Sequence, residues 1–323
     1  MVATGLAAEK LVQGYVKASG KAKAAWATSS PQERLRALLD PANTLLGPIG
    51  VPRVVGVIDP LGNMAGSANH ANFGRGTWTM WFNPDILDAN ITDPEFWRRA
   101  GIVYHEARHA EQTYRVARKL ARDGNPADKI ATMIGIPASV ASKVSGSPLA
   151  PATQEWKEAE GWQLNMQAGD DGLSRADLVN TQKDAAIAKY EEARFVRRSL
   201  ESVMKGDPDA PGNLKKVYAD AMSKPDGAAR MKELLETWQN NHMVAREKAK
   251  QWYLAYAKMP VEQDAWSTGG LVEAKAGFTP STPEQELKNL DADERVMIPI
   301  AVMRLLGGSQ QERDLIVALG SAL

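Results

Sequence analysis

The sequence contains no cysteine. This absence excludes disulfide bonds, a thiolate nucleophile, an iron–sulfur cluster and any zinc site with cysteine ligands. His, Asp and Glu therefore remain as the side chains that could bind a metal ion, and the chain has only 4 His. The lack of cysteine is compatible with both reducing and oxidising compartments, so it does not indicate location.

The chain also has no excess of charge of either sign, because Lys+Arg and Asp+Glu both number 39. We expect no nucleic-acid binding, which needs an excess of basic side chains to neutralise phosphates. No uncharged apolar run approaches the roughly 18 residues of a membrane-spanning helix. Glu9 and Lys10 interrupt the apolar residues at the start, where a secretory signal peptide would need a continuous run. We therefore expect a soluble protein that binds no membrane and that, if exported, uses a route independent of a signal peptide.

Apolar residues recur at helical spacing along most of the chain, and 44% of all residues are apolar. Two short segments differ and are predicted as strands. Residues 51–59 are rich in β-branched side chains, and in residues 76–83 successive side chains alternate between two faces. A loop rich in Gly and Asn separates them. Helices are expected at 3–27, 31–39, 94–122, 154–168, 174–204, 212–223, 227–258, 260–270, 283–306 and 309–322. The sequence thus predicts an α+β protein that is mainly α, with one small sheet.

The helix expected at 94–122 contains the sequence HEARH, which is an HExxH motif. Its two histidines, His105 and His109, are slightly more than one helical turn apart, so both imidazoles point the same way and can share one metal ion. Glu106 lies about 100° around the helix from His105, close enough to reach a water molecule on that metal without binding the metal itself. This arrangement is typical of zinc hydrolases, in which the glutamate removes a proton from the attacking water.

The rest of this helix divides into three sectors at about 100° per residue. The sector of His105 also holds Ile102, His109, Gln112 and Val116. The opposite side is an apolar stripe of Val103, Ala107, Ala110, Tyr114, Ala117 and Ala121. A charged third sector holds Arg108, Glu111, Arg115 and Arg118, and we expect it to face solvent. Such a helix would be buried on its back and would line a cleft with its histidines.

A catalytic zinc ion usually takes a third protein ligand and keeps one open position. The other histidines of the chain are His70 and His242. The favoured acidic candidate is Glu262, just after Pro260 at the start of a short helix, and Asp264 is the second choice. These two carboxylates are about 200° apart on a regular helix, so we do not expect both to bind the same ion.

An HExxH helix that follows a short strand resembles the zincin-like metallopeptidases. The segments HEARHAEQ and PVEQDAW are most similar to the zincin-like domains attached to bacterial secreted toxins and injection-system cargo. In that group a P-x-E-x-x-A pattern on a later helix supplies the carboxylate ligand, and here it matches Pro260, Glu262 and Ala265. The resemblance also implies that the strand at 76–83 is an edge strand that pairs with extended substrate.

The resemblance covers roughly residues 50–120 and 250–270 and implies one zincin-like domain, 1–323. Within it we expect four parts: N-terminal helices (1–48), the small sheet and active-site helix (49–122), a helical elaboration (123–258), and the third-ligand helix with C-terminal helices (259–323). The chain differs from compact members of this group in the long segment between the histidines and Glu262. The helical elaboration predicted at 123–258 makes up most of this segment.

The resulting prediction is a zinc metallopeptidase. His105, His109 and Glu262 bind Zn²⁺, and Glu106 is the general base in hydrolysis of a peptide bond. The peptide substrate, a role as a secreted toxin or effector, and an immunity or secretion-system partner follow from the resemblance alone. The alternatives are a non-catalytic zincin-fold scaffold or partner-binding module of a secretion system, and a helical protein without metal. Glu106 favours the enzyme, because a scaffold has no use for a general base.

Overall fold

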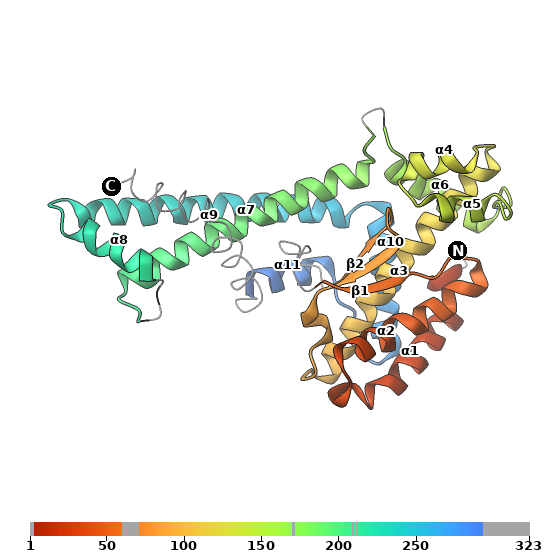
Figure 1. Cartoon of the computed structure of the whole chain (residues 1–323), viewed down its shortest axis with the longest axis horizontal. Helices are drawn as coiled ribbons and strands as arrows, with labels where there is room; N and C mark the ends of the chain where they lie inside the picture. Colours follow the sequence, from red (N-terminus) through yellow and green to blue (C-terminus); the bar gives the residue numbers. More distant parts are fainter. Residues whose placement is uncertain (1–2, 60–70, 170–171, 209, 211, 293–323) are drawn as a thin grey trace. The chain divides into compact units, whose positions relative to one another are not determined.

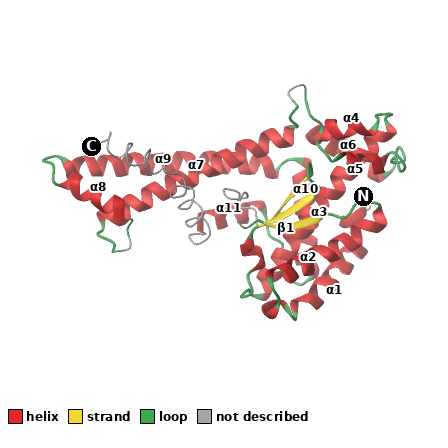
Figure 2. Ribbon diagram, in the orientation of Figure 1, coloured by secondary structure: helices red, strands yellow, loops and turns green. Residues whose placement is uncertain are grey.

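The computed structural model describes residues 3–292 apart from 60–70, 170–171, 209 and 211 (Figure 1). These residues are mainly helical and carry a small mixed sheet of three strands, which agrees with the predicted fold class (Figure 2). The helices are α1 (Glu9–Lys23), α2 (Pro31–Leu46), α3 (Asp93–Arg122), α4 (Ala127–Ile134), α5 (Ala138–Val144), α6 (Gln154–Met166), α7 (Arg175–Met204), α8 (Gly212–Met222), α9 (Gly227–Ala257), α10 (Pro260–Lys275) and α11 (Pro283–Ala292). Short 3-10 turns are η1 (Gly5–Ala7), η2 (Trp26–Thr28), η3 (Gly47–Ile49) and η4 (Pro84–Leu87). Within the described residues, no helix is long and apolar enough to cross a membrane.

The long helix α3 begins at Asp93 and ends at Arg122, as the sequence predicts. Its start is fixed by a capping box, in which Thr92 accepts a hydrogen bond from the Glu95 backbone and the Glu95 side chain accepts one from the Thr92 backbone. Pro94 in the first turn needs no hydrogen-bond partner for a backbone N–H, because it has none. These local signals set the first turn of the helix that carries the HExxH motif.

Helix α2 is longer than predicted, because it continues past Leu39 to Leu46. A proline inside a helix removes a backbone hydrogen bond, and Pro41 lies in the middle of α2. Buried Leu38, Ala42 and Leu46 nevertheless continue the apolar face across Pro41. Burial of this face offsets the lost hydrogen bond, so the proline does not end the helix.

The sheet has the strand order β1-β3-β2. The two predicted strands are present in shorter form as β1 (Val55–Ile58) and β3 (Thr79–Phe82), and they are parallel. The Gly/Asn-rich segment predicted as a loop contains a third strand, β2 (Ala71–Gly74), which pairs antiparallel with β3. The expectation that residues 76–83 form the edge strand is therefore wrong, because β3 is central. Strand β2 lies at the edge and contacts α3.

Two further differences concern helices. The segment after α3 forms α4 and α5, where the sequence predicted no helix. Helix α10 continues beyond the predicted end at Gly269–Gly270 to Lys275. The helix predicted at 283–306 is described only as α11, and the one predicted at 309–322 lies outside the described residues.

The described chain divides into two compact units. The first contains the residues up to Thr181 together with Leu254–Lys288, and the second contains mainly Gln182–Tyr253. The segment 123–258, predicted as one helical elaboration, is thus divided between them. In the first unit, helices α1 to α6, the sheet and α10 contribute to one apolar core. In the second, apolar side chains of α7, α8 and α9 form a separate small core.

Candidate metal centre

Helices α3 and α10 approach closely where two glycines face each other. A Cβ atom on Gly269 would lie 2.7 Å from the carbonyl oxygen of Gly101 and 3.1 Å from Cβ of His105. A Cβ atom on Gly101 would lie 3.1 Å from the carbonyl oxygen of Gly269. The missing side chains allow α10 to lie against the histidine-bearing face of α3, and this contact brings Glu262 to the motif.

We expect Gly269→Ala to separate the two helices and to weaken metal binding. The added methyl group meets backbone, which cannot move aside as a side chain can, so a loss of about 1–3 kcal/mol of stability is expected. Urea unfolding of the metal-free protein measures this loss. The control is Gly161→Ala on α6, where a Cβ would meet nothing within 4 Å and where alanine should stabilise the helix. Equal stability of the two variants would contradict the proposed role of the crossing.

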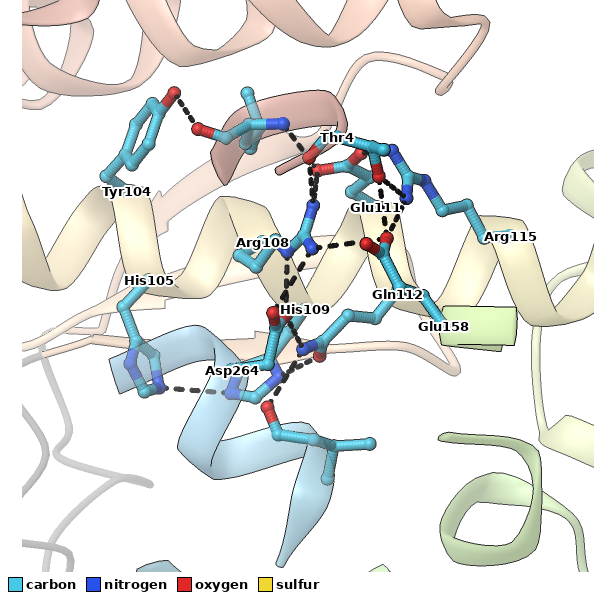
Figure 3. Close-up of polar contacts among 12 residues, drawn as sticks. Thr4, Tyr104, His105, Arg108, His109, Glu111, Gln112, Arg115, Glu158 and Asp264 are labelled. Carbon is cyan, nitrogen blue, oxygen red and sulfur yellow. Dashed lines mark hydrogen bonds and ion pairs between the residues drawn. The ribbon is translucent and has the colours of Figure 1, made fainter. Parts of the chain in front are cut away.

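His105, His109 and Glu262 form one group that could hold a metal ion, with their ligand atoms all within 4.8 Å of one another. The two Nε2 atoms are 3.0 Å apart, and both rings lie on the same side of α3 (Figure 3). Nε2 of His105 is 3.5 Å from Oε2 of Glu262, and Nε2 of His109 is 3.3 Å from Oε1 of the same carboxylate. A tetrahedral site with bonds of 2.0–2.1 Å has ligand atoms about 3.3 Å apart, so this triangle has the size that zinc needs.

The charges of this group also suit a cation. Burial alone would raise the pKa of Glu262, but the neighbouring imidazoles of His109 and His105 outweigh burial and lower the pKa. Burial likewise disfavours a charge on His109, whereas Glu262 raises its pKa to about 9. Among the described residues, no group donates a hydrogen bond to buried Oε2 of Glu262. A buried carboxylate oxygen without a donor beside two imidazole nitrogens is a donor set that a divalent metal ion would satisfy.

Glu106 lies beside these three residues. Its Oε1 is 3.9 Å from Nε2 of His105, and its Oε2 accepts a 2.7 Å hydrogen bond from the backbone N–H of Phe73 on β2. The side chain is buried, and burial raises its pKa above the usual value although His105 and His109 lie nearby. The strand that the sequence reading missed therefore holds the carboxylate that the motif predicts as the general base.

Asp264, the second choice as a third ligand, points to a different set of partners. It accepts two hydrogen bonds from the Arg108 guanidinium, at 2.7 and 3.2 Å, and a third from the Gln112 amide at 2.7 Å. Of the other two histidines, His242 belongs to α9 in the second unit, where its ring lies next to that of Tyr190, and His70 lies outside the described residues. Glu262 is thus the acidic candidate that meets the two histidines.

Three of the four residues in the charged sector of α3 are buried, so the expectation that they face solvent is wrong, whereas Arg118 is half-buried. Arg108, Glu111 and Arg115 are all at most 3% exposed. Glu111 accepts a hydrogen bond from Arg108 at 2.7 Å and pairs with Arg115 at 2.5 Å. Glu158 of α6 pairs with Arg115 at 2.6 Å, and Figure 3 shows these side chains gathered on one side of α3. The alternating charges neutralise one another inside the protein.

The residues before α1 cover this cluster. The backbone N–H of Leu6 donates to Glu111 at 2.9 Å, and the carbonyl of Thr4 accepts from Arg108 at 3.1 Å. Gly5 between them has φ of +55°, and a Cβ on it would overlap the Glu111 carboxylate. Glycine is therefore required at this point of the turn.

One aromatic side chain near the metal group was not singled out by the sequence. Trp266 follows Glu262 by one turn of α10, and its ring contacts that of His105 edge-on, with centroids 5.2 Å apart. The half-buried indole forms one wall beside the first histidine. A P-x-E-x-x-A pattern says nothing about the next position, so only the structure assigns Trp266 to the site.

Comparison of the chain with family models, with curated proteins and with solved structures gives no match. The chemistry of this centre is therefore inferred from its own residues and their geometry.

Proposed function

We propose that the protein is a zinc-dependent metallopeptidase that hydrolyses a peptide bond. The observation that carries this proposal is the position of Glu106 beside the group formed by His105, His109 and Glu262. A zinc site kept only for stability is usually closed by four protein ligands, whereas hydrolysis requires three ligands with a separate carboxylate beside them, as Glu106 provides here.

The donor set favours zinc over Mg²⁺ and Ca²⁺. Two imidazoles and one carboxylate are the ligands of many catalytic zinc sites, whereas Mg²⁺ and Ca²⁺ prefer oxygen ligands alone. Zn²⁺, when bound, supplies Lewis-acid activation of water and of the substrate carbonyl. His105, His109 and Glu262 would hold it, and their three-residue set agrees with a site that keeps one position open.

Glu106 performs the proton transfers in this proposal. The N–H of Phe73 engages Oε2, so the carboxylate is fixed in one orientation while Oε1 remains on the side of His105. A carboxylate with a raised pKa is well suited to take a proton from the attacking water and return it to the leaving amine. The peptide substrate itself comes from the resemblance to zincin-like enzymes, since another amide would need the same groups.

We expect purified protein to bind one equivalent of Zn²⁺ and to be stabilised by it. At a free Zn²⁺ concentration of about 100 times the dissociation constant, the stabilisation should be about 2.7 kcal/mol. Glu262→Ala should lower the affinity for Zn²⁺ more than Asp264→Ala does, because Asp264 is bonded to Arg108 and Gln112 instead. Competition with a chelating dye measures the affinities, and thermal unfolding measures the stabilisation.

Activity is tested on the same preparations with a mixture of unstructured peptides, analysed by mass spectrometry. The proposed function predicts cleavage by the zinc-loaded protein and none after chelation. Absence of zinc binding would contradict the whole proposal. Zinc binding without any cleavage would instead favour the non-catalytic scaffold.

A further inference from the structure

Gln112 connects the two helices that supply the metal ligands. It lies on α3, is fully buried, and has its amide oxygen 2.8 Å from Nδ1 of His109. Its amide nitrogen donates to the carbonyl of Val261 at 2.8 Å and to Asp264 at 2.7 Å, both on α10. All three of these hydrogen bonds are thus directed at a ligand or at the helix that carries another ligand.

These contacts determine which way the amide faces. Val261 offers a carbonyl and Asp264 a carboxylate, and both can only accept hydrogen bonds. The nitrogen of the Gln112 amide must therefore face α10, and its oxygen must face His109. An oxygen acceptor there requires Nδ1 of His109 to carry a hydrogen, which leaves Nε2 as the nitrogen that can bind a metal.

Asp264 is in turn held by a buried arginine. Arg108 is 1% exposed, bonds to Asp264 through two nitrogens, and is itself fixed by Glu111. The path from Arg108 through Asp264 and Gln112 ends at His109, and Figure 3 shows the Asp264 carboxylate between Arg108 and Gln112. Asp264 is therefore connected to His109 by the hydrogen bonds of Gln112.

We propose that Gln112 is the positioning residue of this metal centre. It orients His109 for metal binding through Nε2, keeps α10 in register with α3 next to Glu262, and is held in place by Asp264. This inference rests on the proposed function, because it assumes that the three ligands bind zinc. Hydrogen bonds to the second nitrogen of a ligating histidine fix its ring and tautomer, and removing such a partner typically lowers metal affinity about 10–100-fold.

The test measures Zn²⁺ affinity for wild type, Gln112→Leu, Asp264→Ala and the double variant. We expect Gln112→Leu to lose about 10–100-fold in affinity. Asp264→Ala should lose less, and the double variant should lose no more than Gln112→Leu alone, because Asp264 acts through Gln112. The visible absorption of the Co²⁺-loaded protein should also change in Gln112→Leu, since it reports the arrangement of the ligands.

Thr113→Val is the matched control. Thr113 is the next residue on α3 and is also buried, and among the described residues its hydroxyl bonds only to the backbone carbonyl of His109. This variant should keep the wild-type affinity and Co²⁺ spectrum. Urea unfolding of each metal-free variant identifies the conditions under which it is folded. If Gln112→Leu does not fold, Gln112→Glu takes its place: it keeps the acceptor toward His109 but sets a carboxylate against Asp264, and a reduced affinity is again expected.

Several results would overturn the inference. These are a Gln112 variant with the affinity of the wild type, a loss in Thr113→Val as large as in Gln112→Leu, or a loss from Asp264→Ala that persists in full in the Gln112→Leu background. The last result would indicate that Asp264 binds the metal directly. A wild-type protein that binds no Zn²⁺ would refute the proposed function itself, which separates the two failures.

Discussion

Replacement of Glu106 by Gln should lower the rate constant for peptide hydrolysis by about 10²–10⁴-fold while zinc remains bound. The amide cannot accept a proton from water, so the reaction loses its general base. Binding of zinc should persist, because His105, His109 and Glu262 are unchanged. The amide oxygen can still accept the hydrogen bond from Phe73 that the carboxylate accepts in the wild-type protein. Single-turnover cleavage and metal content are measured on the same sample.

Glu273→Gln is the control for this substitution. Glu273 is another buried glutamate, on α10, and it accepts hydrogen bonds from Ser281 at 3.1 and 2.9 Å. Burial raises its pKa as well, so the control is also a buried carboxylate with a raised pKa, but it lies away from the two histidines. The control variant should retain activity. Full activity of Glu106→Gln would remove the proposed mechanism and leave the metal site without a catalytic role.

The largest expected effect on stability comes from Glu111→Ala, with a loss of about 3–5 kcal/mol in the free energy of unfolding. Glu111 is completely buried and bonds to Arg108, to Arg115 and to the backbone of Leu6. Its removal leaves two buried guanidinium groups short of a negative partner. An uncompensated buried charge costs far more than the pair contributed while it was intact.

Urea unfolding of the metal-free protein measures this loss, and Glu158→Ala is the comparison. Glu158 belongs to the same cluster and pairs with Arg115, but its side chain is 18% exposed, so water can replace it more readily. We expect a smaller loss there. A loss below about 1 kcal/mol for Glu111→Ala would show that the cluster is solvated, as the spacing of its charges predicts.

The two histidines of the centre could be predicted from the sequence because they lie only four residues apart on one helix. One turn of helix places His105 and His109 together, and a helical pattern with a capping residue is visible in the sequence. Glu262 was predicted from the short P-x-E-x-x-A pattern on a later helix, and in the structure it lies beside the two histidines. The choice between Glu262 and Asp264 needed the structure, since it depends on which face of α10 meets α3.

The buried charges could not be predicted, because a sequence pattern does not show what covers a helix face. Arg108, Glu111 and Arg115 have the spacing of surface ion pairs. What buries them is the segment Thr4–Leu6 and Glu158 on α6, which are distant in sequence. Only a tertiary contact distinguishes a solvated charged face from one in which each charge has a buried partner.

Strand β2 and the full length of α10 were missed for related reasons. The four residues of β2 lie among Gly and Asn, which local preference assigns to loops, and the pairing with β3 overrides that preference. Gly269 and Gly270 suggest a helix end by local preference, yet α10 continues through them, and Gly269 is glycine because its contact with Gly101 leaves no room for a side chain. In both cases a long-range contact determines the local structure.

The second unit lies in the chain between the histidines and their acidic partner, and this order has a consequence for biosynthesis. A nascent chain that has released α3 presents His105 and His109, whereas Glu262 emerges about 150 residues later, after Gln182–Tyr253 has been translated. Cotranslational folding can therefore form the two-histidine turn early, but a metal site that needs all three residues must wait until Glu262 has left the ribosome.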